Sequence, residues 1–303
     1  MLVFAARGKQ FCLCNPVPTV PASAGTSTMA CPNMLSTLTL RRILAGPAFT
    51  DIRTAINLMP LIAFMARGDL RARYKRSVLG PLWLTLGTAM GTLGLGLVWS
   101  ELFKMERDKF VPALTAGLIM WQLLSGCILE ATTTYWRQAS IIRNVSMPLS
   151  VHPIQMVVKH LVNFFHNLPV FIIVVYFFNV PVTPATLLFI PCMLLLIANL
   201  LWITLLFSML GARFRDLEYV VAAALPVLMF LSPVFYRPNY LPVSGELMWL
   251  NPFSYLIELI RYPLLGTAPP AFVVVTNLLY CAIGWVFAIS VFNAKRDRIA
   301  YWV

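Results

Sequence analysis

The chain has 303 residues, of which 59% are hydrophobic and only 11% are charged. Globular domains carry about 25% charged residues, so this chain has too few charges to cover a water-facing surface. The formal net charge is +12, but the basic residues stand at the ends of apolar blocks, as topology signals and lipid contacts do. We therefore expect an all-α integral membrane protein that binds membrane lipids and no nucleic acid.

The N-terminal segment, residues 1–50, differs in composition from the rest of the chain. Prolines within residues 16–21 interrupt any helix, and no apolar periodicity is present. A signal peptide is the alternative, but polar residues at 7–10 break the apolar stretch that it needs. We expect residues 1–50 to be disordered or to precede the true start, and residues 51–303 to form one transmembrane permease domain.

An amphipathic pattern comes before the first apolar block. Apolar residues recur at i, i+3, i+4 and i+7, which is one face of a helix: Leu58, Leu61, Ile62 and Met65. A basic cluster at residues 67–76 follows, and Gly80-Pro81 then permits a bend. The pattern predicts a helix on the membrane surface with its cations among lipid phosphates. If the cations only fix topology, the apolar stripe remains unexplained.

About six apolar segments approach the roughly 20 residues that cross a bilayer. The weakest is the fifth, because Pro226 and Pro233 interrupt it. Lysine and arginine are concentrated in alternate connections, and the positive-inside rule then places both termini in the cytoplasm. The predicted spans are residues 79–103, 111–135, 157–178, 187–210, 219–236 and 272–292.

The connection between the fifth and sixth spans, residues 237–270, carries its own helix pattern. Pro252 can occupy the first position of a helix. Glu258 and Arg261 form an i,i+3 pair, and an apolar face is made by Phe253, Leu256, Ile257 and Ile260. Since this helix is too short to span a bilayer, we expect a re-entrant or interfacial segment on the external side.

Polar residues within the spans offer few catalytic groups. The sequence has no Gly-x-x-x-x-Gly-Lys-Ser/Thr phosphate loop, and neither its cysteines nor its histidines have metal-site spacing. We expect no catalytic residue, metal or cofactor in this chain. Glu130 is either functional, because a buried charge is costly, or paired locally near Arg137. Interhelical hydrogen bonds are the expected role of Asn163, His166, Asn167 and Asn199.

Several segments, in this order, resemble one known family. They are the stretch from Arg67 through Gly80-Pro81 to Trp83, residues 215–219 and 232–236, Asn251-Pro252 followed by Arg261, and residues 296–302. Together they resemble the ABC-2 type permeases that export polysaccharides, over residues 55–303. Within that family the chain is most similar to exporters of O-antigen and capsular polysaccharide.

The resemblance implies a homodimeric, multi-pass permease of the bacterial inner membrane. It would bind a separate ABC ATPase, which holds ATP and Mg, and would pass a lipid-linked polysaccharide between its protomers. The lipid head would approach Arg71, Arg73, Tyr74, Lys75 and Arg76. The ATPase would couple through Arg143, Asn144, Met147, Pro148, Arg213, Arg215 and Asp216.

Two further expectations concern the channel and its coupling loop. Channel or glycan contacts are expected at Trp83, Trp121, Glu130 and Tyr135, although ordinary packing or interfacial anchoring also explains the aromatic residues. Family members usually have lysine at the position of Arg143 and an aromatic residue at that of Met147, so the ATPase contact differs here.

Two other functions remain open from the sequence. One is efflux of a drug or lipid by the same fold. The other is a membrane glycosyltransferase or acyltransferase, but such an enzyme should show clustered acidic or histidine residues, and the sequence has none.

Overall fold

The computed structural model describes residues 46–75, 77–80, 82–102, 104, 106–235 and 245–303, all of which belong to the unit of residues 41–303. Arg76 and most of the N-terminal segment predicted to be disordered lie outside this part of the chain. Its elements are all helical: α2 Pro47–Asn57, α3 Met59–Tyr74, α4 Leu82–Leu102, α5 Arg107–Ala131, α6 Thr134–Arg137, α7 Ala139–Asn144, α8 Val151–Phe177, η1 Pro184–Leu188, α9 Phe189–Arg213, α10 Leu217–Leu231, α11 Gly245–Leu250, α12 Pro252–Leu264 and α13 Ala271–Trp302. The prediction of an all-α membrane protein is confirmed.

Five helical stretches in the described residues are long and apolar enough to cross a membrane: α4, α5, α8, η1 with α9, and α13. They coincide with five of the predicted spans. Three of them are longer than predicted, since α8 already begins at Val151, η1 with α9 covers Pro184–Arg213, and α13 continues to Trp302. Charged and polar residues continue these helices beyond their apolar windows, and hydropathy alone does not detect such extensions.

The remaining predicted span, residues 219–236, corresponds to α10, which has only 15 residues. At 1.5 Å per residue it is about 22 Å long, less than the roughly 30 Å of a hydrocarbon core. The helix ends at Leu231, and Pro233, two residues further on, cannot continue it. By length, therefore, α10 does not qualify as a span.

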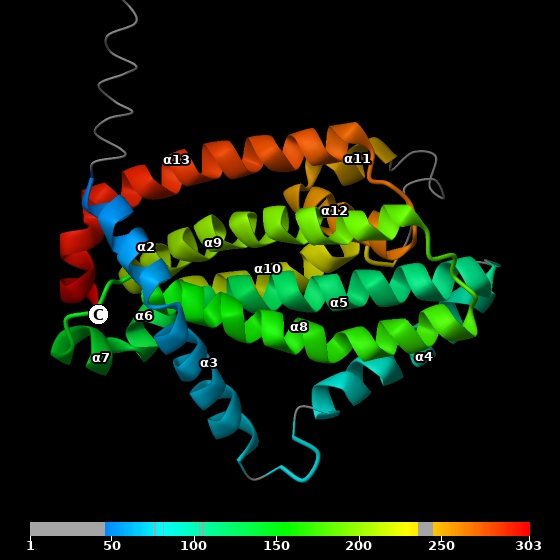
Figure 1. Ribbon diagram of the computed structural model, residues 1–303, viewed down its shortest axis with the longest axis horizontal. Helices are drawn as coiled ribbons and strands as arrows, with labels where there is room; N and C mark the ends of the chain where they lie inside the picture. Colours follow the sequence, from blue (N-terminus) through cyan, green and yellow to red (C-terminus); the bar gives the residue numbers. More distant parts are fainter. Residues whose placement is uncertain (1–45, 76, 81, 103, 105, 236–244) are drawn as a thin grey trace, which may run out of the picture. The chain divides into compact units, whose positions relative to one another are not determined.

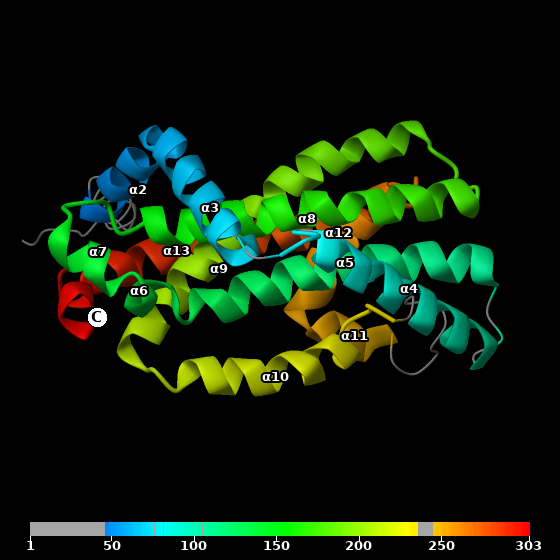
Figure 2. The ribbon, with the colours of Figure 1, turned by 90° about the horizontal axis from the view of Figure 1, so that it is seen from below.

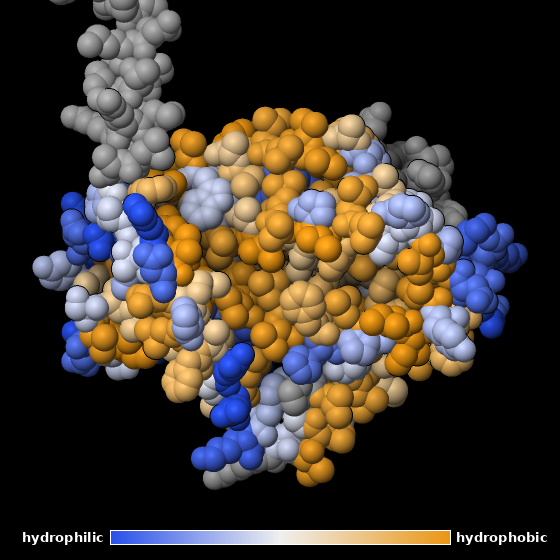
Figure 3. All heavy atoms as spheres, viewed as in Figure 1, coloured by the Kyte–Doolittle hydropathy of each residue, from blue (hydrophilic) through white to orange (hydrophobic). Residues whose placement is uncertain are grey.

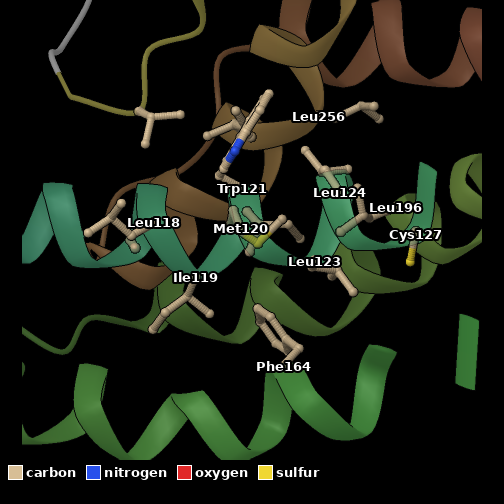
Figure 4. Close-up of a cluster of buried hydrophobic side chains, with 14 of the residues drawn as sticks. Leu118, Ile119, Met120, Trp121, Leu123, Leu124, Cys127, Phe164, Leu196 and Leu256 are labelled. Carbon is tan, nitrogen blue, oxygen red and sulfur yellow. The ribbon is translucent and has the colours of Figure 1, made fainter. Parts of the chain in front are cut away.

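Helix α5 lies at the centre of the bundle. It packs against α4, α8, α9, α10 and α12, and the long helices run side by side in both views (Figures 1 and 2). Figure 4 shows its apolar side chains in contact range of neighbours such as Leu196 of α9 and Leu256 of α12. The outer helices keep apolar side chains on the surface, where Figure 3 shows an apolar band between two hydrophilic ends. This band suits contact with lipid.

Small and amide side chains bring these helices together. A Cβ on Gly211 of α9 would overlap the carbonyl of Thr132, and one on Gly284 of α13 would overlap the ring of Trp202. The Asn199 amide donates to the carbonyl of Asn277 over 3.2 Å, which joins α9 to α13. Close glycine contacts and interhelical hydrogen bonds are the means by which membrane helices associate.

The amphipathic helix is present as α3, but part of its apolar stripe contacts protein. Ile62 is fully buried, and Leu58 and Met65 pack beside it against α8, at Val151, Ile154 and Val158. Phe64 stays largely exposed, so lipid contact of this helix remains a prediction. The predicted domain boundary at residue 50 falls inside α2, which begins at Pro47.

The predicted external helix is α12. The Asn251 side chain accepts a hydrogen bond from the Phe253 amide and caps the helix, with Pro252 at its first position. Glu258 and Arg261 form the expected pair at 2.8 Å, fully inside the protein, and Arg261 also donates to the Pro233 carbonyl after α10. The pair thus fixes α12 against the end of α10, and a re-entrant position in the membrane stays a prediction.

Candidate functional site

A cavity of about 440 Å³ lies along α5, between α8 and α10. Its volume is within the roughly 300–1,000 Å³ that is usual for ligand pockets. Most of the α5 side follows i, i+3, i+4 and i+7 spacing along one helix face, at Gln122, Ser125, Gly126 and Leu129, and Ile119, Trp121 and Leu123 also line it. From Ile119 to Leu129 the cavity follows about 15 Å of the helix axis.

The two walls have the same spacing as the α5 face. The wall on α8 is polar with one aromatic ring, whereas the wall on α10 is apolar. Arg73 of α3 and Leu84 of α4 also contribute to the lining. The α8 wall consists of His160, Asn163, Phe164 and Asn167, and the α10 wall of Ala222, Leu225, Pro226 and Met229.

A hydrogen-bond network holds α4, α5 and α8 together at the cavity. The Gln122 amide donates to the Thr88 hydroxyl over 3.0 Å, and the Asn167 amide donates to the Gln122 carbonyl oxygen over 2.9 Å. The Thr88 hydroxyl lies 3.1 Å from the Asn167 carbonyl oxygen. Asn167 therefore has the interhelical role that the sequence predicts.

Asn163 differs from these amides. Its side chain lines the cavity and is 9% exposed, yet it has no hydrogen-bond partner among the described residues. The His166 imidazole lies 2.8 Å from the Val162 carbonyl of its own helix, but the backbone carbonyl of His166 accepts a hydrogen bond from the Thr85 hydroxyl of α4 over 3.1 Å. His166 therefore joins α8 to α4 through its backbone, whereas the Asn163 side chain makes no interhelical hydrogen bond in the described part of the chain.

Glu130 lies next to this cavity rather than in its lining. Its carboxylate accepts hydrogen bonds from Lys159 and from His160 of α8, the latter over 2.9 Å. Gly126 leaves room for the imidazole, because a Cβ there would lie 2.7 Å from the His160 ring. Local pairing of Glu130 is therefore present, but with α8 and not with Arg137, which faces Glu218 at 4.0 Å.

The predicted aromatic contacts separate into distinct environments. Trp121 lines the cavity, and its ring packs on Phe253 with 6.0 Å between centroids. Trp83 lies on the exposed surface of α4. Tyr135 is completely buried among residues such as Phe292, so its ring has no open face on which a sugar could stack.

The predicted basic cluster touches the cavity at a single described residue, Arg73. Arg71 and Lys75 are exposed on α3, and Tyr74 is half-buried. The helix thus presents several cations beside the cavity and inserts one of them into its lining.

The segments expected to contact the ATPase are joined through the C-terminal end of α13. Arg143 of α7 donates to the Val303 carbonyl over 2.5 Å, and the Arg213 guanidinium lies 5.4 Å from the centre of the Trp302 ring. Asn144, Arg215 and Asp216 are exposed, while Met147 packs at the foot of α8 and Pro148 is half-buried. In Figures 1 and 2, α2, α6, α7 and the C-terminus lie at the same end of the bundle.

Asp51 of α2 is a residue at this end that sequence reasoning missed. It is 4% exposed, and it accepts hydrogen bonds from the backbone amide (3.0 Å) and hydroxyl (2.6 Å) of Ser150. It also forms an ion pair with Arg296 of α13 at 3.0 Å. The carboxylate therefore fixes the loop before α8, which contains Met147 and Pro148. Residues 51, 150 and 296 are far apart in the sequence, and no motif indicates that they lie together.

Among the described residues, no group of three or more His, Cys, Asp and Glu side chains could hold a metal ion. The described lining of the cavity offers amide and imidazole groups, the Arg73 guanidinium and apolar surface. These groups can bind a ligand through hydrogen bonds, charge and apolar contact.

Comparison with known proteins gives consistent similarities. Residues 60–265 match the model of the ABC-2 type transporter family. The chain is 24% identical over 253 residues to the O-antigen export system permease protein RfbA of Klebsiella pneumoniae, covering 80% of this chain and 95% of that protein. It is 25% identical over 258 residues to the protein of the same name from Myxococcus xanthus, covering 82% of this chain and 97% of that protein.

Proposed function

The chain belongs to the ABC-2 type transporter family, and from this premise we propose that it is the permease subunit of an exporter of lipid-linked polysaccharide, of the O-antigen or capsule type. Its similarity to O-antigen export permeases over almost their whole length carries this proposal. The amide-bearing α8 wall of the cavity supports it, because a hydroxyl-rich chain needs hydrogen-bonding groups on its path.

ATP hydrolysis would come from a separate ABC ATPase with its own ATP and Mg. The described end of the bundle that carries Arg143 and Arg213 offers a docking surface, since both residues are tied to the C-terminal end of α13. A movement of α7 or of the end of α9 would therefore be transmitted to α13. From α13, the ion pair with Asp51 would transmit it to the start of α8. We place this end and both termini in the cytoplasm of a bacterial cell, at the inner membrane.

The lipid-linked head would approach along α3. Arg71 and Lys75 are exposed on the protein surface, and Arg73 lines the cavity. A phosphate group could therefore contact cations on the surface of α3 and then Arg73 in the cavity lining. A second copy of the chain would complete the path. The outward face of α4 suits such a contact, because Gly87 and Gly91 have open space around them and permit close helix packing.

Deletion of the gene in its own host tests the export function. We expect loss of surface polysaccharide and accumulation of lipid-linked polysaccharide inside the cell, restored by the wild-type gene only when the partner ATPase can hydrolyse ATP. Normal surface display in the deletion strain would contradict the proposal. Retention of a dye or lipid, with polysaccharide display intact, would instead support drug or lipid efflux.

A further inference from the structure

We propose that the cavity between α8 and α10 binds an uncharged sugar unit of the transported chain, and that the Asn163 amide is its free hydrogen-bonding group. This inference rests on the proposed export function and deepens it. The observation behind it is the contrast between Asn163 and the other amides of the cavity.

Asn163 carries unused hydrogen-bonding capacity at a buried position. A carboxamide can donate two hydrogen bonds and accept two. Gln122 and Asn167 use their groups on each other and on Thr88. Asn163, at 9% exposure and in the cavity lining, has no such partner in the described residues. A hydroxyl group, which both donates and accepts, would satisfy it.

The charge distribution favours a neutral guest at this position. One turn from Asn163, His160 of the same wall and Lys159 both bond the Glu130 carboxylate, so this carboxylate is already paired. Arg73 is the charged side chain in the lining, and it comes from α3 at the edge. A phosphate therefore belongs at Arg73, whereas the wall around Asn163 suits a ring that carries hydroxyl groups.

The opposite wall matches the apolar face of a sugar ring. Leu225, Pro226 and Met229 of α10 face the polar wall, and Trp121 and Phe164 contribute aromatic surface. Sites for small ligands commonly combine apolar and aromatic walls with a few polar groups that fix orientation. A lipid tail would fill the same volume but would leave the Asn163 amide without a partner.

Binding of a soluble oligosaccharide to the purified permease–ATPase complex in lipid nanodiscs tests this site. The probe is the oligosaccharide that mild acid releases from the host's own surface polysaccharide. We expect Asn163→Leu to weaken binding at least tenfold without lowering the melting temperature, because the Asn163 side chain lines the cavity and makes no hydrogen bond to the described residues. Asn167→Leu is the contrasting variant, and it should lower the melting temperature because it breaks the network with Gln122.

Two outcomes would overturn the sugar site. One is unchanged binding by Asn163→Leu, and the other is loss of thermal stability in that variant as large as in Asn167→Leu, which would give Asn163 a structural role. Phospholipid that co-purifies with the wild type, is displaced by the oligosaccharide and is retained by Asn163→Leu in equal or greater amount would likewise assign the cavity to a lipid tail. In each case the deletion strain can still lack surface polysaccharide, so failure of the sugar site is distinguishable from failure of the export function.

Discussion

Two glutamate–cation pairs with the same i,i+3 spacing differ strongly in burial. The side chains of Glu258 and Arg261 are 3% and 2% exposed, whereas those of Glu106 and Lys109 are 71% and 64% exposed. Breaking a buried pair leaves a buried charge and costs about 3–5 kcal/mol, while exposed pairs contribute little. We expect Glu258→Gln to lower the melting temperature clearly and Glu106→Gln to leave it unchanged, as measured in detergent. Equal effects would show that burial does not decide the contribution of the pair.

Glycines offer a second comparison at the scale of single residues. A methyl group on Gly211 would overlap the Thr132 backbone, but one on Gly68 of α3 would meet nothing within 4 Å. Overpacking costs about 1–3 kcal/mol, whereas alanine in an open helical position is favoured over glycine by up to about 1 kcal/mol. Gly211→Ala should therefore lower the thermal stability and Gly68→Ala should maintain or raise it. A stable Gly211→Ala variant would contradict the close packing of α9 on the end of α5.

At the scale of elements, Asp51 connects α2, the start of α8 and the end of α13. Arg296→Gln should loosen this connection, and we expect export to fall more than ATP hydrolysis, both measured in the same proteoliposomes. The matched control is Arg298→Gln on the same helix, because this side chain is exposed and is not one of the described contacts of Asp51. Parallel loss of both activities, or equal behaviour of the two variants, would refute a coupling role for the Asp51 contact.

Apolar blocks predict the long helices well because each block alone determines where a membrane helix can form. Their ends depend on other contacts. Helix α10 ends at Leu231, before Pro233, and the Arg261 side chain binds the Pro233 carbonyl from a distant helix. The sequence does not predict helix α2, because the segment before it has no apolar periodicity. What buries Ala48 is contact with a cluster that includes residues of α13, and those residues are distant in the sequence.

Only part of the site could be predicted from the sequence, because the spans contain several asparagines and the sequence does not distinguish their roles. Asn167 and Asn199 join helices, but Asn163 faces a cavity. The difference arises from which helix lies opposite each residue, and this arrangement is a property of the assembled bundle. Trp121 and Arg73 were predicted and do line the cavity. Tyr135 was predicted for similar reasons and is buried elsewhere.

At the scale of the whole molecule, the topology can be tested with single cysteines in an otherwise cysteine-free chain. Asp108 follows α4, and Arg215 lies between α9 and α10; both are exposed. The distribution of lysine and arginine predicts that these positions lie on opposite sides of the membrane. We expect a membrane-impermeant thiol reagent added outside spheroplasts to label Asp108→Cys but not Arg215→Cys. The reverse pattern would invert the orientation and remove the proposed ATPase surface from the cytoplasm.

The Asp51 contact also has a consequence for biosynthesis. Asp51 and Ala48 belong to the first described helix, but their partners Arg296 and Asn293 each lie 245 residues later in the chain. Helix α2 therefore cannot reach its final position until residues 293–296 have been synthesised and α13 has been inserted. A nascent chain arrested before residue 293 should leave this segment open to protease, and its protection would mark the moment at which α13 docks on α2.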